Sequence, residues 1–267
     1  MIFAELHGKL GQDCSRAHER AEDVLTSTAF GLLRYIPRAD GHLPLLARVR
    51  RVRLDSSHQA VAALAPGWPA LADLLQVQTD FWPYAPGYGE PDVLLTLSDA
   101  DGIPRLAVLL EAKLHAGKSG HADVDEELTG VDAPDPDQLV RYWRLLRQLD
   151  SVRRGAVPLL VYLTRHSTAP VEELTDSLRR EPGMNLGWLS WRDVWDVAVR
   201  AAPDNLPAAD LARLLAHKGL KTFDGFNTAP CELPPSGRFW NGPSWFAPVA
   251  PWTGPTGTHF WKGGGNG

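Results

Sequence analysis

The sequence predicts a mixed α/β fold, in which a sheet of parallel and antiparallel strands is flanked by helices. Two observations lead to this prediction. Apolar residues recur with helical spacing in some segments and with strand-like runs in others. These segments follow one another as helix, strand, hairpin, helix, strand, which is an α-β-β-β-α-β order. In chain order they occupy residues 15–35, 73–82, 92–97, 105–114, 135–149 and 157–164.

The first predicted helix is amphipathic, with Ala21 and Leu25 in its apolar stripe, and Pro37 ends it. A basic stretch at 47–53 alternates in a strand-like way. The segment 73–82 is a predicted strand that leads into a loop rich in Pro, Gly and Tyr.

The next two strands form a predicted hairpin. Asp101-Gly102 is a strong signal for a two-residue turn, which pairs residues whose numbers add up to 203. Both strands are apolar at odd and even positions alike, as expected for strands that are covered on both faces.

A polar, acidic loop at 115–134 follows and is expected to be mobile and to line the substrate entrance. Beyond the helix and strand already named, the predicted elements are a helix at 170–180, a short strand at 187–191, and helices at 192–201 and 208–220.

The domain prediction is a main domain at 1–205 and a C-terminal helix and extension at 206–267. Residues 226–267 are rich in Pro, Gly and Trp and lack any periodicity. Their tryptophans predict packing on the main domain, on a second copy or on a protein partner; base stacking is the alternative. These tryptophans are Trp240, Trp245, Trp252 and Trp261.

Composition sets outer limits on function. The chain has 267 residues, 44% of them hydrophobic, and a net charge of −5. That charge argues against a broad polyanion-binding surface but leaves room for a local basic groove. No run is long enough to span a membrane, and the N-terminus lacks a secretion-signal pattern. Cys14 and Cys231 match no metal spacing, which indicates a reducing cytoplasm.

Gly117-Lys118-Ser119 follows an apolar run, as a phosphate-binding loop would. The full motif requires glycine at the position that Ala112 occupies. The residues after Ser119 are acidic and would repel a triphosphate. This segment is therefore not expected to bind a nucleotide.

The predicted hairpin register places Asp92 opposite Glu111 on one face of the sheet, and Lys113 shares that face two residues further on. Three charged groups would then converge at the end of an apolar hairpin, where burying them is costly. A metal ion relieves that cost, and two carboxylates suit Mg²⁺.

Glu90-Pro91-Asp92, followed by Glu111-Ala112-Lys113 in the next strand, resembles the PD-(D/E)XK nuclease superfamily. The α-β-β-β-α-β order is also that family's core. Gln138 and Tyr142, in the sequence QLVRY, are similar to the Q-x-x-x-Y element of RecB-type members. The resemblance covers roughly residues 15–165 and implies a restriction-endonuclease-like fold.

The resemblance also implies roles. Asp92 and Glu111 would bind Mg²⁺, with Mn²⁺ as a substitute, and Lys113 would polarise water and stabilise charge on the phosphorane. Glu22 in the first helix is the expected further metal ligand, with Glu19 as its alternative. Gln138 and Tyr142, together on one helix face, would contact the scissile nucleotide or position Lys113.

The resulting interpretation is a cytoplasmic Mg²⁺-dependent nuclease that acts on nucleic acid, with DNA as the expected substrate, in a setting such as bacterial defence or repair. The alternative is a catalytically silent nuclease-like subunit for nucleic-acid binding or complex assembly. The sequence leaves open DNA or RNA, internal or terminal cleavage, specificity and oligomeric state.

Each residue also has a structural interpretation. Asp92 could cap a turn, and Glu111 with Lys113 could form an ion pair on a solvated edge. Glu22 could be an ordinary solvated helix residue, and Tyr142 could be core. Gln138 could complete a capping box, with Asp135 as N-cap and Pro136 as the first helical residue. His115 and His121 lack the partners that a zinc site requires.

Overall fold

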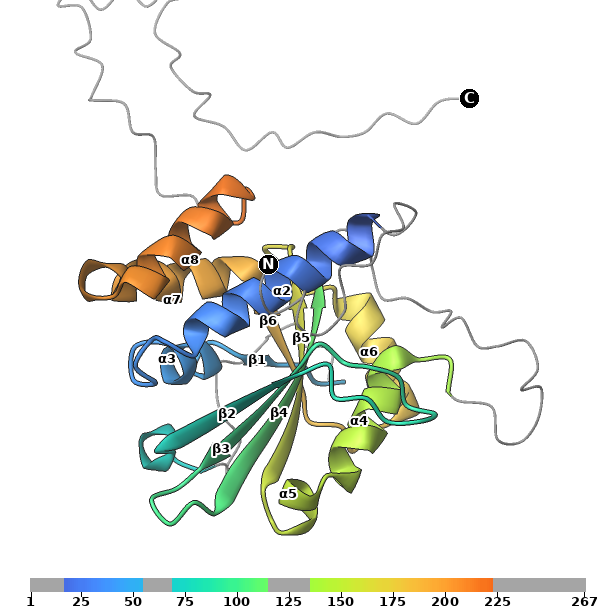
Figure 1. The fold of residues 1–267 in the computed structure, drawn as a ribbon. Helices are drawn as coiled ribbons and strands as arrows, with labels where there is room; N and C mark the ends of the chain where they lie inside the picture. The colour runs from blue at the N-terminus through green and yellow to red at the C-terminus, as the bar shows by residue number, and fades with distance from the viewer. Residues whose placement is uncertain (1–16, 55–68, 115–134, 223–267) are drawn as a thin grey trace, which may run out of the picture. The chain divides into compact units, whose positions relative to one another are not determined.

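The computed structural model describes residues 17–54, 69–114 and 135–222 (Figure 1). Within these ranges six strands form one sheet, in the order β1-β6-β5-β4-β3-β2. The pairs β4–β5 and β5–β6 are parallel, and the other pairs are antiparallel. The predicted mixed α/β class is therefore confirmed. The strands are β1 Arg50–Arg51, β2 Gln76–Phe81, β3 Val93–Ser98, β4 Pro104–Lys113, β5 Val157–Thr164 and β6 Leu186–Ser190.

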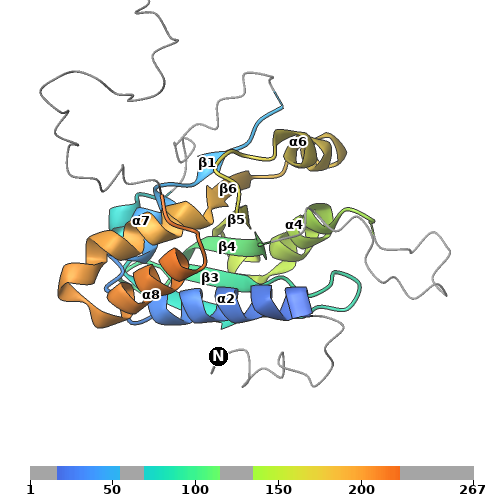
Figure 2. The ribbon, with the colours of Figure 1, turned by 90° about the horizontal axis from the view of Figure 1, so that it is seen from above.

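Helices cover both faces of the sheet (Figure 2). One buried cluster joins α2, α3, α7 and α8 to the side chains at positions 106, 108 and 110 of β4. A second cluster joins α4 and α6 to positions 107 and 109. The helices are α2 Ala17–Leu33, α3 His42–Leu46, α4 Gln138–Gln148, α5 Asp150–Arg153, α6 Val171–Arg180, α7 Trp191–Ala201 and α8 Leu206–His217, with short 3₁₀ turns at Leu71–Asp73 and Ala202–Asp204.

Two strands are shorter than predicted. The basic stretch at 47–53 contributes only the two residues of β1. The segment at 73–82 begins in a 3₁₀ turn and becomes extended at Gln76. The compact unit that holds the sheet runs to Phe223 and so includes α8, which packs on α7.

The hairpin between β3 and β4 has the predicted register but a different turn. The backbone N–H of Asp99 donates to the carbonyl of Ile103, which leaves a three-residue loop that ends at Gly102 with φ of 74°. Arg105 is an extra residue in β4, where the register shifts. The prediction of a two-residue turn was therefore wrong. The extra residue in β4 offsets the extra residue in the loop, so Val93 still pairs with Leu110 as predicted.

The apolar stripe of α2 is rotated from the predicted one. Leu25, Ala29, Phe30 and Leu33 are buried, whereas Ala21 is half-buried. The buried positions match the helical period, and Leu25 belongs to both the predicted and the observed stripe, whereas Ala21 lies at its margin. Glu22 lies three residues before Leu25, so the helix carries it toward the end of β4.

Helix α4 begins later than the capping-box interpretation requires. Asp137 is its N-cap, and the carboxylate accepts the backbone N–H groups of Leu139 and Val140. Gln138 is thus the first helical residue, not the third, so it cannot close a capping box on Asp135. The side chain of Gln138 instead contacts Glu111, in the site described below.

No helix in the described ranges is long and apolar enough to cross a membrane. Several predictions concern residues outside those ranges. They concern the predicted loop at 115–134 with His115, Gly117-Lys118-Ser119 and His121, the two cysteines, and the tryptophan-rich segment at 226–267.

Candidate active site

Asp92 stands immediately before β3, and its carboxylate reaches the neighbouring strand. The pairing of Val93 with Leu110 places Asp92 next to the position of Glu111. Asp92 Oδ2 accepts the backbone N–H of Ala112 at 2.7 Å, and the residue is only 7% exposed. Asp92 therefore does not cap its own turn, because its hydrogen bond crosses to β4.

Glu111 and Lys113 lie on the α4-facing side of β4. Lys113 Nζ is 2.7 Å from Glu111 Oε1. Glu111 is 2% exposed, so the pair does not lie on a solvated edge. The interpretation of a surface ion pair is wrong, since a solvated pair would leave the carboxylate in water.

Glu22 joins the same cluster from the opposite layer of the fold. Its Oε1 lies 3.2 Å from Lys113 Nζ, and its Oε2 accepts the backbone N–H of Leu114 at 2.6 Å. Helix α2 and helix α4 cover opposite faces of β3 and β4 (Figure 2). The site is therefore assembled at the end of β4 by groups from both layers. Glu19 also lies in α2, but its side chain is outside the described set.

Gln138 and Tyr142 complete the cluster from α4. The amide of Gln138 donates to Glu111 Oε1 and to Tyr142 Oη, both at 2.9 Å. Tyr142 is 3% exposed and packs in the second core cluster, so it is both a core residue and a site residue. A Cβ atom on Gly89 would lie 3.4 Å from the Tyr142 ring, and Gly89 has a φ of 93°. The loop before Asp92 thus requires glycine at this position.

Burial and crowding shift the pKa values of these groups. Burial, reinforced by the neighbouring Glu111, raises the pKa of Asp92 well above its usual range. Burial also raises the pKa of Glu111, although Lys113 opposes that effect. Burial alone would lower the pKa of Lys113, but the surrounding carboxylates outweigh it and the net shift is upward. The lysine therefore remains an ammonium ion at neutral pH.

Tyr142 is held in its neutral form. Burial raises the pKa of its phenol, and the charge of Glu111 raises it further. Because the phenol oxygen already accepts a hydrogen bond from Gln138, its own proton is directed elsewhere. The phenol is consequently a hydrogen-bond donor for a group that enters the site.

The carboxylates suit a divalent cation that takes only one or two of its ligands from the protein. Among the described residues no cluster of three or more His, Cys, Asp and Glu side chains is placed to hold a metal ion. Within the same residues, Asp92 Oδ1 and Glu111 Oε2 accept no hydrogen bond. Mg²⁺ commonly binds through one or two carboxylates together with water and substrate phosphate, and these two oxygens suit that mode.

All six residues named from the sequence lie together, but the sequence did not reveal what fixes them. The backbone N–H groups of Ala112 and Leu114 hold Asp92 and Glu22, and backbone donors carry no residue-type signal. Arg165 was also missed. It follows the end of β5, and the parallel pairing of Lys113 with Thr164 places it beside the site.

Comparisons of the chain with protein-family models, with curated proteins and with solved structures found no match. Any functional conclusion therefore depends on the geometry and chemistry of the site.

Proposed function

We propose that the protein is a metal-dependent nuclease that hydrolyses phosphodiester bonds, with DNA as the expected substrate. One observation carries the proposal: Asp92, Glu111 and Lys113 converge at the ends of two adjacent strands, with a carboxylate oxygen of each acid left open. Their order along the chain and their place in a mixed sheet support a restriction-endonuclease-like core.

Asp92 and Glu111 are the groups that would hold Mg²⁺. Bound there, the ion would neutralise charge on the phosphate and lower the pKa of a water molecule, the two contributions that phosphodiester hydrolysis needs most. When all three carboxylates are ionised, as metal binding requires, they and the one ammonium give the cluster a net charge of −2, which is the complement of a divalent cation. An excess of buried negative charge without a counterion would be costly.

Lys113 acts in this proposal through its charge. Its raised pKa excludes a role as general base, because the amine holds its proton at neutral pH. The ammonium is fixed from two sides, by Glu111 and Glu22. It is therefore preorganised to stabilise the negative charge that develops on the phosphorane.

Glu22 positions Lys113 rather than binding metal directly. Both of its carboxylate oxygens already accept hydrogen bonds, from Lys113 and from the backbone of Leu114. Gln138 is a positioning residue for Glu111, and Tyr142 presents a phenol proton to the substrate phosphate. This division refines the roles that the sequence resemblance implies.

One observation favours a catalytically silent subunit as the second candidate. Without metal, the ammonium of Lys113 already pairs with Glu111 and Glu22, so the cluster has a metal-free arrangement with most partners satisfied. A binding subunit could retain this arrangement as a structural element. A subunit that only binds nucleic acid gains nothing, however, from buried carboxylates that repel phosphate.

A cleavage assay tests the proposal. Supercoiled plasmid, linear duplex, single-stranded DNA and RNA are incubated with the protein in Mg²⁺ and in EDTA, beside a Glu111→Gln variant. We expect wild type to cleave at least one substrate in Mg²⁺ only, and the variant to be at least 10²-fold slower, as typical for loss of one preorganised charge. If no substrate is cleaved in a metal-dependent way, the nuclease proposal fails and the catalytically silent subunit becomes the favoured function.

A further inference from the structure

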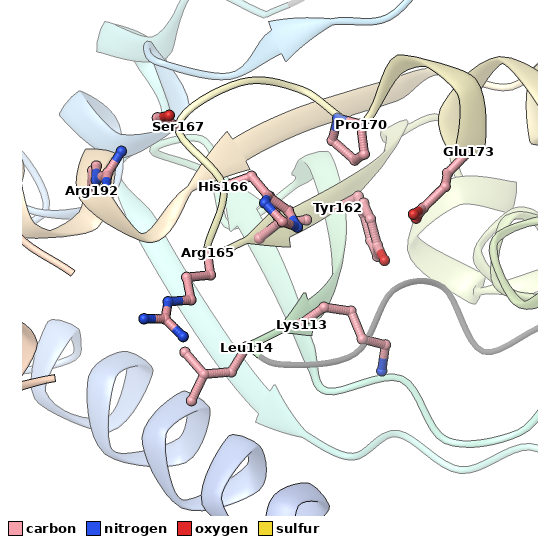
Figure 3. Close-up of a pocket in the computed structure, with 10 residues that line it drawn as sticks. Lys113, Leu114, Tyr162, Arg165, His166, Ser167, Pro170, Glu173 and Arg192 are labelled. Atoms are coloured by element: carbon pink, nitrogen blue, oxygen red, sulfur yellow. The ribbon is translucent and has the colours of Figure 1, made fainter. Parts of the chain in front are cut away.

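A polar cavity of about 400 Å³ adjoins the candidate active site at Lys113 (Figure 3). It is formed where β4 and β5 end, by the loop that follows β5 and by the first turn of α7. Lys113 pairs with Thr164 across these parallel strands, so the loop begins directly beside the active-site lysine. Arg165 and His166 line the cavity from that loop, and Arg192 lines it from α7.

The two arginines of this cavity lack acidic partners. Within the described ranges, no carboxylate forms an ion pair with Arg165 or Arg192. The contrast with Arg50 is informative, because Arg50 lies nearby and forms a two-pronged pair with Asp193. The chain is acidic, with a net charge of −5, yet no carboxylate of the described residues pairs with either of the two arginines that line this cavity.

Arg192 supplies a second observation. Its Nε is buried and has no hydrogen-bond partner among the described residues. Leaving such a donor unsatisfied costs about 1–3 kcal/mol, and more when the group is charged. A ligand that accepts hydrogen bonds in the plane of the guanidinium group would remove that cost. Phosphate does so well, because its oxygens match the two-pronged geometry of arginine.

The distribution of charge sets the side on which an anion binds. Glu173 is the one carboxylate among the residues that line this cavity, and it comes from α6, away from Arg192 (Figure 3). A phosphate is therefore drawn to the side of the two arginines. A second cavity of about 610 Å³ shares Ser167 and Arg192 with the first. Its two carboxylates, Asp193 and Asp196, are paired with Arg50 and Arg48.

We propose that Arg165 and Arg192 bind a backbone phosphate of the nucleic acid, adjacent to the phosphate that reacts at Lys113. The inference rests on the proposed function for the identity of its ligand, because a substrate strand that enters the active site continues past it. Phosphates follow one another about every 3.4 Å of helix axis on each strand, so a neighbouring phosphate lies within reach of the adjoining cavity.

The test is equilibrium binding of a fluorescent single-stranded oligonucleotide in EDTA, where metal-dependent cleavage does not interfere. We expect Arg165→Ala with Arg192→Ala to weaken binding about 10-fold or more and to reduce the salt dependence of log K by about 0.7 for one lost phosphate contact. Lysine at both positions should preserve the salt dependence but not the full affinity, because lysine lacks the two-pronged fork.

The matched control is Arg153→Ala with Arg200→Ala, which removes the same charge from two exposed arginines. Arg153 lies in α5, just before the start of β5, and so at the other end of that strand. The proposal is overturned if the Arg165 and Arg192 variant binds like wild type, or if the control loses as much affinity. Oligonucleotides with and without a 5′-phosphate distinguish a terminal phosphate from an internal one: a loss confined to the phosphorylated strand assigns a terminal phosphate to the site, and an equal loss assigns an internal one.

This test is separable from that of the proposed function. If wild type cleaves no substrate but the arginine variant loses affinity and salt dependence, the nuclease proposal fails and the phosphate site stands. If wild type cleaves and the arginine variant binds unchanged, the phosphate site fails and the nuclease proposal stands.

Discussion

Among the described residues, two clusters of buried or half-buried charge differ in the balance of their positive and negative groups. The arginine–aspartate cluster consists of Arg48, Arg50, Asp193 and Asp196. It has two charges of each sign. Its acids are also satisfied by other donors: Asp193 by the backbone of Ser190 at the start of α7, and Asp196 by the hydroxyl of Thr222.

The active-site cluster consists of Glu22, Asp92, Glu111 and Lys113. It has three acids and one base, and two of its carboxylate oxygens accept no hydrogen bond from the part of the chain that the structure describes. The comparison teaches that buried charge by itself does not mark a functional site. A balanced and satisfied cluster ties elements together, whereas an unbalanced one needs a ligand of opposite charge to complete it.

The largest expected effect is on catalysis. Lys113→Ala should lower turnover on the order of 10²-fold or more, because it removes the charge that faces the developing phosphorane. Lys113→Arg should recover little, since the bulkier guanidinium group cannot replace a compact ammonium. The control is Lys218→Ala, an exposed lysine at the end of α8. Steady-state rates measure the effect on turnover, and a circular-dichroism melt of each variant checks that it is folded. Equal rates for Lys113→Ala and wild type would show that the lysine has no part in the mechanism.

A substitution in the arginine–aspartate cluster should change the stability of the protein rather than its turnover. Asp193→Asn should lower the free energy of unfolding by about 2–3 kcal/mol, less than a fully buried pair because Arg50 is one-third exposed. The variant also loses charge from the capping box of α7. Denaturant unfolding measures the change. A loss below about 0.5 kcal/mol would mean that the cluster does not hold β1 to α7.

The same chemical change should have the opposite sign at Asp92. In metal-free protein at pH 7, Asp92→Asn should stabilise the fold by about 1–2 kcal/mol, a common gain when a strained functional position is relieved. Asparagine keeps an oxygen for the N–H of Ala112 and loses the buried negative charge. Thermal melts in EDTA of this variant and of Asp193→Asn form a matched pair. Destabilisation of both would contradict the distinction between the clusters.

The pH dependence of that gain has a fixed sign. Burial raises the folded-state pKa of Asp92 above the unfolded value of about 3.9. Between those two values the folded state holds more protons, so metal-free wild type loses stability as the pH rises through this window. The advantage of Asp92→Asn should therefore be small near pH 4 and increase toward neutral pH. If the stability advantage of Asp92→Asn instead shrinks as the pH rises, the pKa of Asp92 is lowered in the folded state and not raised.

The smallest effects separate two adjacent residues of α4. Asp137→Ala should cost about 1 kcal/mol of stability, because Asp137 is the N-cap. Gln138→Ala should leave stability within about 0.5 kcal/mol, as expected away from the cap, and should lower turnover by about 10-fold through its bond to Glu111. Unfolding curves and rates for both variants test this. A larger stability loss from Gln138→Ala would restore a structural role for that residue.

The hairpin shows how much of the fold could be predicted. Two apolar runs and the Asp101-Gly102 turn between them were enough to place β3 and β4 side by side with the right register. The turn itself was misread, because Asp99 organises a three-residue loop by accepting the N–H groups of Asp101 and Ile103. A bulge at Arg105 then offsets the longer loop. Periodicity constrains the faces of strands more strongly than it constrains the turn between them.

The candidate site shows the corresponding limit. The placement of Asp92, Glu111 and Lys113 follows from strand register. Gln138 and Tyr142 were implied by the sequence resemblance, and helical spacing places them on one face. The engagement of Glu22 with Lys113 could not be predicted, because it depends on the rotation of α2 against the sheet. Arg165 could not be placed from the sequence, because its position beside the lysine depends on the parallel pairing of β4 with β5.

If a divalent cation completes the unbalanced cluster, calorimetric titration of Mg²⁺ and of Mn²⁺ into the metal-free protein will detect it. We expect saturable binding of a single ion to wild type. Asp92→Asn should lose that binding, because an amide keeps the shape and loses the charge. Asp193→Asn should bind the ion like wild type. Absence of saturable binding to wild type at millimolar metal, or unchanged binding in Asp92→Asn, would show that the cluster does not hold a cation.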